Sequence, residues 1–310
     1  MKNEARQTAN ARSDQVEALL EGAIDLHCHS GPSVMPRDID HIEALRQASE
    51  VKMKAILIKD HYYAATPVTE LLNLHFGDLG VLALSGVPLN NASGGFNVFA
   101  VDHGLKLGAK LVWMPTFSAA NHIDHHKKDD DFVNKFPQTV KKALDPEPLT
   151  VLDGNGKLLD VVIPILELIA EHDVVLSSGH LHISEIWPLF EEARKRGVNR
   201  LLVNHPTFVV DATLEDMAVL ADMGVFMEHS LCMFMPGSKF KFWDSEDLDQ
   251  YIKAGTVDKT ILGSDLGQQG NPYPVDGFRD VIGKCLDLGY SDQQIRKMES
   301  GNAQALLGLN

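Results

Sequence analysis

Two histidines separated by a single residue, His27 and His29, follow a short apolar run near the start of the chain. If this segment is extended, its side chains alternate between two faces, so both imidazoles point to one side and Cys28 to the other. Two imidazoles held side by side at the end of a strand provide half of a metal site. The alternative is a pair of histidines that only satisfy hydrogen bonds at a strand end.

More candidate ligands stand at the ends of other apolar runs along the chain. These residues are Lys59, Asp60, His61, His180, His182, His205, Glu228, His229 and Asp265. Several imidazoles with one carboxylate suit zinc, manganese, iron or nickel better than magnesium or calcium. The pattern therefore predicts one or two divalent transition-metal ions per chain, with zinc as the first choice.

The composition limits the class of protein. A chain of 310 residues with 44% hydrophobic residues can form one large domain or two small ones. Its net charge of −15 argues against nucleic acid or an anionic membrane as the main partner. Three scattered cysteines favour a reducing compartment, and the chain shows no targeting or membrane-spanning segment. We therefore expect a cytoplasmic protein that acts on a small molecule.

The elements that must position these residues follow a repeated order of apolar strand, loop and amphipathic helix. The expected strands are 23–29, 54–59, 80–85, 109–114, 173–178, 200–205, 224–229 and 260–265, and expected helices include 39–51, 161–172, 184–196 and 212–223. Near-continuous apolar strands are typical of parallel sheets buried on both faces. Eight such units predict an α/β protein with a (β/α)8 TIM barrel, in which reacting residues lie at the carboxyl ends of the strands.

We expect residues 1–310 to form a single domain, with an N-terminal extension over 1–21 and a long insertion over 116–160. Connections of this length are usually functional or disordered, and we interpret the insertion, which follows the fourth strand, as a lid or a subunit contact. It contains His122, His125 and His126, which either reach the barrel mouth or belong to a solvated loop. A homo-oligomer is compatible with this organisation.

The ordered set of motifs resembles the amidohydrolase superfamily of metal-dependent hydrolases. The resemblance spans residues 23–309 and includes the tail Ser300-Gly301-Asn302-Ala303-Gln304-Ala305-Leu306-Leu307-Gly308-Leu309. The segments DLHCHS at 25–30, KDH at 59–61, NHP at 204–206 and GSD at 263–265 are also similar to those of the polymerase-and-histidinol-phosphatase (PHP) phosphoesterases. Eight strands rather than seven favour the first family.

The resemblance to the amidohydrolases implies roles for particular residues. It makes His27, His29, His180, His205 and Asp265 the metal-binding group, with Asp265 binding metal or accepting the proton of the attacking water. His205 is the second choice for that base. The chain departs from the binuclear members after the fourth strand, where Met114-Pro115-Thr116 offers no carboxylated lysine or glutamate. The site is then mononuclear, or the bridge comes from elsewhere.

Lys59 is the candidate for such a substitute bridge. A lysine buried near cations has a lowered pKa and can react with carbon dioxide to form a carbamate; the alternative is an ordinary ion pair. His61 shares a face with Lys59 and is a further candidate ligand. Arg37 either binds an anionic group of the substrate or lies on the surface.

We expect a hydrolase that uses metal-activated water on an amide, lactone, ester or phosphoester of a small molecule. The missing bridge and the closing segment 301–309 keep open a mononuclear decarboxylase or other lyase on the same scaffold. A barrel that binds metal without turnover is the third alternative.

Overall fold

Eight parallel strands form one sheet in chain order. The computed structural model describes residues 2–127 and 144–309, and all statements about structure refer to these residues. Each strand pairs in parallel with the next, from β1 to β8. The strands are β1 Ile24–Cys28, β2 Ala55–Ile58, β3 Leu82–Pro88, β4 Leu111–Trp113, β5 Val175–Ser177, β6 Leu201–Asn204, β7 Phe226–Ser230 and β8 Thr260–Gly263. All eight overlap the runs expected from sequence, and β3 continues three residues past the expected end at 85.

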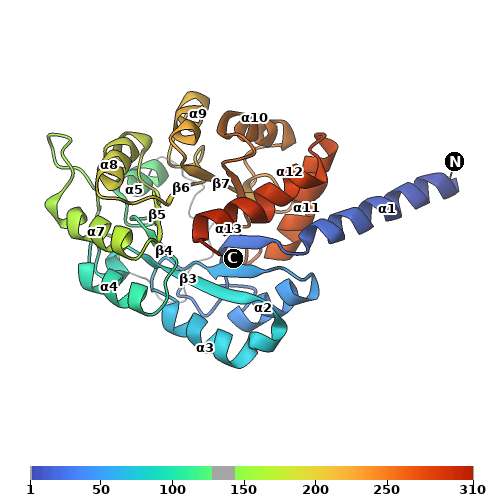
Figure 1. Ribbon diagram of the computed structural model, residues 1–310, viewed down its shortest axis with the longest axis horizontal. Helices are drawn as coiled ribbons and strands as arrows, with labels where there is room; N and C mark the ends of the chain where they lie inside the picture. The colour runs from blue at the N-terminus through green and yellow to red at the C-terminus, as the bar shows by residue number, and fades with distance from the viewer. Residues whose placement is uncertain (1, 128–143, 310) are drawn as a thin grey trace.

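Helices follow the strands and surround the sheet (Figure 1). The α-helices are α1 Lys2–Leu20, α2 His41–Glu50, α3 Thr66–Phe76, α4 Val98–Lys106, α5 Ala120–His126, α7 Ile163–Glu171, α8 Ile183–Lys195, α9 Leu214–Asp222, α10 Ser245–Gly255, α11 Pro274–Asp287, α12 Asp292–Arg296 and α13 Asn302–Leu307. Short turns are η1 Gly77–Leu79, η2 Asn91–Ser93, η3 Asp160–Val162, η4 Leu231–Met233 and the π-helical η5 Lys297–Gly301. The N-terminal helix α1 spans most of the expected extension over 1–21 and projects from the barrel (Figure 1).

The barrel is closed by the chain that continues past β8. The amide of Asp265 donates to the carbonyl of His27 at 2.7 Å, and the amide of His29 donates to the carbonyl of Leu266 at 2.9 Å. These bonds join the last strand to the first, so the predicted (β/α)8 barrel is confirmed. They also place Asp265 directly beside the two histidines.

Alternate residues of the strands fill the barrel with apolar side chains. Its interior cluster contains Ile24, Leu26, Ala55, Leu57, Leu84, Leu111, Trp113, Val175, Leu202 and Ile261, and helix α13 adds Ala303, Leu306 and Leu307. The residues between them, such as Ile56 and Val203, pack outward against the helices. This alternation is the one expected for strands buried on both faces.

At the next inward-facing positions toward the carboxyl ends of the strands lies a set of mostly polar residues, which we call the polar layer. Its members are His27, Lys59, Trp113, Ser177, Asn204 and Glu228, all at most 1% exposed. Glycines occupy the corresponding positions on β3 and β8. A Cβ at Gly86 would lie 2.7 Å from the Trp113 ring, and one at Gly263 would lie 2.7 Å from the Glu228 carboxyl carbon. The glycines therefore leave the space that these two side chains fill.

A register irregularity in β1 turns the two histidines toward the barrel mouth. Pairing with β2 shifts between Asp25 and Cys28. Ile24 and Leu26 point into the barrel, whereas Cys28 packs in the outer cluster. Bulges of this kind re-aim side chains next to active sites. The buried Asp25 carboxylate holds the segment, because it accepts hydrogen bonds from the amides of His27 and Ser264, both at 2.9 Å.

The insertion after β4 is described in part. Helix α5 follows β4 directly, and residues 149–152 pair with the start of this helix and with residue 158. Residues 128–143 of the predicted lid lie outside the described residues. Within residues 2–127 and 144–309, no helix combines the length and apolar character needed to cross a bilayer.

Candidate metal centre

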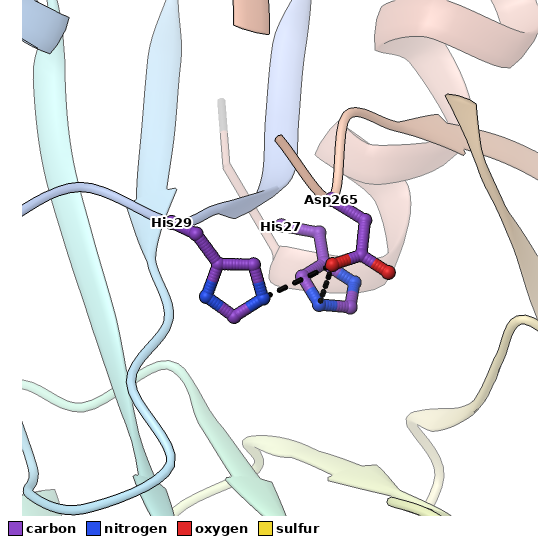
Figure 2. A group of neighbouring side chains, drawn as sticks. All are labelled: His27, His29 and Asp265. Carbon is purple, nitrogen blue, oxygen red and sulfur yellow. Dashed lines mark ion pairs between the residues drawn. The ribbon is translucent and has the colours of Figure 1, made fainter. Parts of the chain in front are cut away.

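Three of the predicted ligands come together at the mouth of the barrel. One ligand atom each from His27, His29 and Asp265 lies within 4.8 Å of the others. The Asp265 Oδ1 atom is 3.0 Å from His29 Nε2 and 3.3 Å from His27 Nε2. Figure 2 shows the carboxylate facing both rings. The group joins the first strand to the end of the last.

A carboxylate deeper in the barrel orients His27. The Nδ1 atom of His27 lies 2.5 Å from Glu228 Oε1, and Glu228 Oε2 accepts from Asn204 Nδ2 at 2.8 Å. Ser177 donates in turn to the Asn204 side-chain oxygen. Because a carboxylate can only accept, Nδ1 of His27 carries the proton and Nε2 offers its lone pair to the mouth. A carboxylate behind a histidine is the arrangement that fixes metal-binding imidazoles.

Unusual backbone conformations occur at the strand ends that form the site. His205 and Asp265 have positive φ angles of 32° and 50°. Non-glycine residues rarely adopt such angles, and they concentrate at functional sites. Gly179 and Gly267 allow the chain to approach closely beside them. A Cβ at Gly179 would lie 2.2 Å from the Met114 carbonyl oxygen, and one at Gly267 would lie 2.1 Å from that of His29.

The other predicted ligands line the same cavity without reaching the group of three. His61 stacks on His29 at a ring-centroid distance of 5.2 Å, and His205 lies 6.1 Å from His27. His180 lies 4.9 Å from His205 and 5.9 Å from His61. They surround a cavity that is partly open to solvent and has an empty volume of about 450 Å³.

Lys59 lies inside the polar layer with its Nζ atom 2.9 Å from His27 Nε2. The Nζ atom also lies 5.6 Å from the centre of the Trp113 ring. Burial lowers the pKa of this lysine. An ammonium and a metal ion cannot share one lone pair of His27, so metal binding there requires Lys59 to withdraw or to lose its charge.

The imidazoles of the cavity are in the form that binds metal. Burial penalises the charged ring, and it lowers the pKa of His29 to about 3 and that of His205 to about 4. The same cause holds the pKa values of His61 and His180 well below the ordinary value. Neutral rings at neutral pH keep a lone pair for a cation.

Asp265 stays ionised despite its surroundings. Burial alone would raise the pKa of this carboxyl. The neighbouring His27, His29 and Lys59 together outweigh burial and hold the pKa of Asp265 well below the ordinary value. The site therefore combines neutral nitrogen donors with one carboxylate.

These donors fit a divalent transition metal. Imidazole nitrogens and a carboxylate oxygen are the ligands that zinc and its neighbours prefer. In addition, the buried Nδ1 atom of His205 has no hydrogen-bond partner among the described residues. A bound ion would give such an atom a partner. His27, His29 and Asp265 would hold the ion, with His205 and His180 next to them.

Two interpretations of weaker candidates are wrong. Arg37, for which a surface position was one of the two alternatives, has a side chain that is only 3% exposed and lines the cavity. His122 does not belong to a solvated loop, because it is buried on α5 with its Nδ1 atom 2.8 Å from that of His180. His125, in contrast, is exposed. His182 caps α8 by accepting from the Ser184 amide.

Sequence reasoning missed Ser177 and Asn204 as supporting residues. Both stand two positions after an inward apolar residue, Val175 or Leu202. A polar side chain that continues the inward face of an otherwise apolar strand is the signal that could have identified them.

Replacing Glu228 by glutamine tests the support of His27. Glutamine has one acceptor oxygen where glutamate has two, so it cannot accept hydrogen bonds from both Asn204 Nδ2 and His27 Nδ1 as Glu228 does. The support of the His27 ring is therefore weakened. Supporting residues of this kind are worth about 10- to 100-fold in metal affinity, so we expect a loss of that size for zinc. Competition with a chromophoric chelator measures it. The exposed Glu246→Gln on α10 is the control, and unchanged zinc affinity in Glu228→Gln would contradict the assignment.

Solved structures with the same fold define the class of this barrel. An amidohydrolase from Pseudomonas aeruginosa superposes with a TM-score of 0.61 at 12% identity, covering 96% of this chain and 98% of that chain. The probable dipeptidase PvdM from the same organism gives 0.62 at 10% identity, with coverage of 96% and 98%. A 2,6-dihydroxybenzoate decarboxylase from Rhizobium gives 0.58 at 11% identity, with coverage of 93% and 99%. The chain therefore has the fold of the amidohydrolases, as its motifs predicted.

A sequence family narrower than this shared fold also matches the chain. Residues 22–228 match the model of a family described as "Family of unknown function (DUF6282)", and the chain belongs to this family. The matched region includes β1 to β6 and the first part of β7 through Glu228. No curated protein matches the chain in sequence.

Proposed function

We propose that this protein is a metal-dependent hydrolase that attacks an amide, lactone, ester or phosphoester bond of a small molecule with water. The convergence of His27, His29 and Asp265 at the mouth of a barrel with the amidohydrolase fold carries this proposal. A divalent ion held there would lower the pKa of a bound water to about 7 and polarise the scissile group. Zinc is the first choice, with manganese, iron or nickel as alternatives and one or two ions per chain.

The residues of the chain supply the rest of the chemistry. Glu228 keeps His27 in one tautomer, and both His27 and His29 are buried. Asp265 either binds the ion or takes the proton of the attacking water, and His205 is the second candidate for that base. Lys59 either stays an ammonium beside His27 or, as a carbamate, adds a carboxylate to the site.

A mononuclear decarboxylase is the second candidate. Met114, Pro115 and Thr116 follow β4 without a side chain that could bridge two ions. The Rhizobium enzyme with this fold is a 2,6-dihydroxybenzoate decarboxylase. Both observations are compatible with one ion and with cleavage of a carbon–carbon bond.

A substrate panel tests both candidates. The protein is stripped with a chelator, reloaded with zinc or manganese, and incubated with N-acyl amino acids, lactones, aryl esters, phosphoesters and aromatic acids. Metal-dependent hydrolysis supports the first candidate, and release of carbon dioxide with one ion per chain supports the second. A purified protein without metal and without turnover would contradict both and favour a binding barrel.

We also propose a reducing, cytoplasmic location. Cys28, Cys232 and Cys285 are buried free thiols. Such thiols are typical of proteins that work where disulfides do not persist.

A further inference from the structure

Arg37 is a buried guanidinium that lacks most of its partners. Its nearest carboxylate oxygen, Asp60 Oδ2, lies 3.7 Å from Nη2, and His29 Nδ1 lies 3.4 Å from the same atom. Paired guanidinium and carboxylate groups normally approach to about 2.7–2.9 Å. The Nε and Nη1 atoms are buried and make no hydrogen bond to any described residue. A charge in this state is costly unless something else binds it.

The backbone around Arg37 is fixed against the loop after β8. Arg37 and Gln268 form an antiparallel bridge. On both sides of it, the amide of Asp38 donates to the Gly267 carbonyl and that of Gln269 donates to the Pro36 carbonyl, each at 3.1 Å. Directly paired residues of such a bridge present their side chains on the same face. Arg37 is therefore held in place next to Gln268 before any ligand binds.

Gln268 offers the complementary half of a binding site. Its Nε2 atom donates to the main-chain oxygen of Asp265 at 2.9 Å. Its Oε1 atom is buried and accepts no hydrogen bond from a described residue. Both Arg37 and Gln268 line the cavity of the metal centre. A cation with free donors and an amide oxygen with free acceptor capacity thus stand side by side.

The remaining wall of the cavity is apolar. Beside His122 and Cys232, this part of the lining consists of Met35, Phe117, Phe208, Met233 and Phe240. These side chains suit a compact apolar or aromatic body. Besides Arg37, the lining residues include the cation Lys59, whose Nζ atom lies 2.9 Å from His27 Nε2.

We propose that the substrate of this site is a small organic acid. Arg37 binds its carboxylate, Gln268 accepts a hydrogen bond from an adjacent hydroxyl or amide N–H group, and the aromatic wall holds its apolar part. The inference rests on the proposed function, because it names the class of molecule that the same cavity would act on. It assigns Arg37 and Gln268 as binding residues for substrate.

Three matched probes separate the parts of this proposal. Mandelate carries a carboxylate, a neighbouring hydroxyl and a phenyl ring; mandelamide lacks the charge, and phenylacetate lacks the hydroxyl. Titration calorimetry measures their binding to the chelator-treated protein and to the zinc-loaded protein. We expect mandelate to bind at least about tenfold more tightly than mandelamide in both forms, and more tightly than phenylacetate.

Variants then assign the effect to residues. Arg37→Met is expected to lose about tenfold or more in mandelate affinity while mandelamide changes little. Gln268→Met is expected to remove the preference for mandelate over phenylacetate. Arg46→Met, an exposed arginine on α2, is the control. Thermal unfolding checks that each variant is folded, and Arg37→Gln replaces Arg37→Met if the latter is not.

Several outcomes would overturn the proposal. These are equal binding of mandelate and mandelamide, no binding of mandelate up to its solubility limit, or discrimination that persists in the Arg37 variant. Discrimination seen only with zinc would assign the carboxylate to the ion instead. Because binding is measured without turnover, a failed hydrolase assay leaves this result intact, and a failed binding assay leaves the hydrolase assay intact.

Discussion

The His27→Ala and His180→Ala variants are expected to lose most of the metal that the wild-type protein retains. His27 belongs to the group of three at the barrel mouth, and removing it leaves two members of that group, His29 and Asp265. His180 comes from the opposite side of the barrel, after β5, and lies 4.9 Å from His205. Elemental analysis of the purified proteins measures the content, and metal-dependent turnover should fall with it.

His182→Ala is the matched control for this experiment. His182 lies two residues from His180, but its half-exposed ring caps α8 rather than facing the cavity. Loss of an N-cap costs about 1 kcal/mol of stability and should leave the metal content unchanged. Full metal content in His27→Ala would refute the site. Full content in His180→Ala alone would remove His180 from the ligand set.

Glu299→Gln is expected to stabilise the protein at neutral pH. Glu299 lies in η5, is fully buried, and neither carboxyl oxygen has a hydrogen-bond partner among the described residues. Burial raises the pKa of this carboxyl to about 8, against the opposing charge of Arg296. The folded protein therefore keeps the proton at pH 7, whereas the unfolded chain, with an ordinary pKa near 4.5, releases it.

The sign of the pH effect follows from this difference. Below about pH 4.5 the Glu299 carboxyl is protonated in both states and does not lower the free energy of unfolding. As the pH rises from there toward 8, this carboxyl lowers the free energy of unfolding by about 1.4 kcal/mol per pH unit. At pH 7 the loss is about 3 kcal/mol, which an uncharged glutamine avoids. Urea unfolding between pH 5 and 8 measures the free energy of unfolding for both proteins. The difference between Glu299→Gln and wild type should grow with pH.

Glu171→Gln, at an exposed carboxylate at the end of α7, is the control for charge removal alone. Its free energy of unfolding should follow that of wild type across the range. If the curve of Glu299→Gln runs parallel to that of wild type, the buried carboxyl does not titrate as described.

The order of elements and the residues at the strand ends could be predicted from sequence. Runs such as Ala55–Ile58 and Leu201–Val203 are apolar at every position. Such continuous apolar runs are typical of strands that are buried on both faces. Once eight such runs alternate with helices, the geometry of a parallel barrel places whatever follows each strand at one mouth. This reasoning identifies His27, His29 and Asp265 as candidate ligands, and the three residues do come together in the structure.

Tertiary structure alone decided how these residues are held. The register shift in β1 depends on Asp25 contacting Ser264, and Glu228 on β7 supports His27 from within the same layer of the barrel. The burial of Arg37 depends on its bridge to Gln268. Each of these contacts joins residues about 200 or more positions apart. The local sequence pattern predicts which face of a strand each side chain occupies. Only the closed barrel determines which distant side chain completes a hydrogen bond or an ion pair.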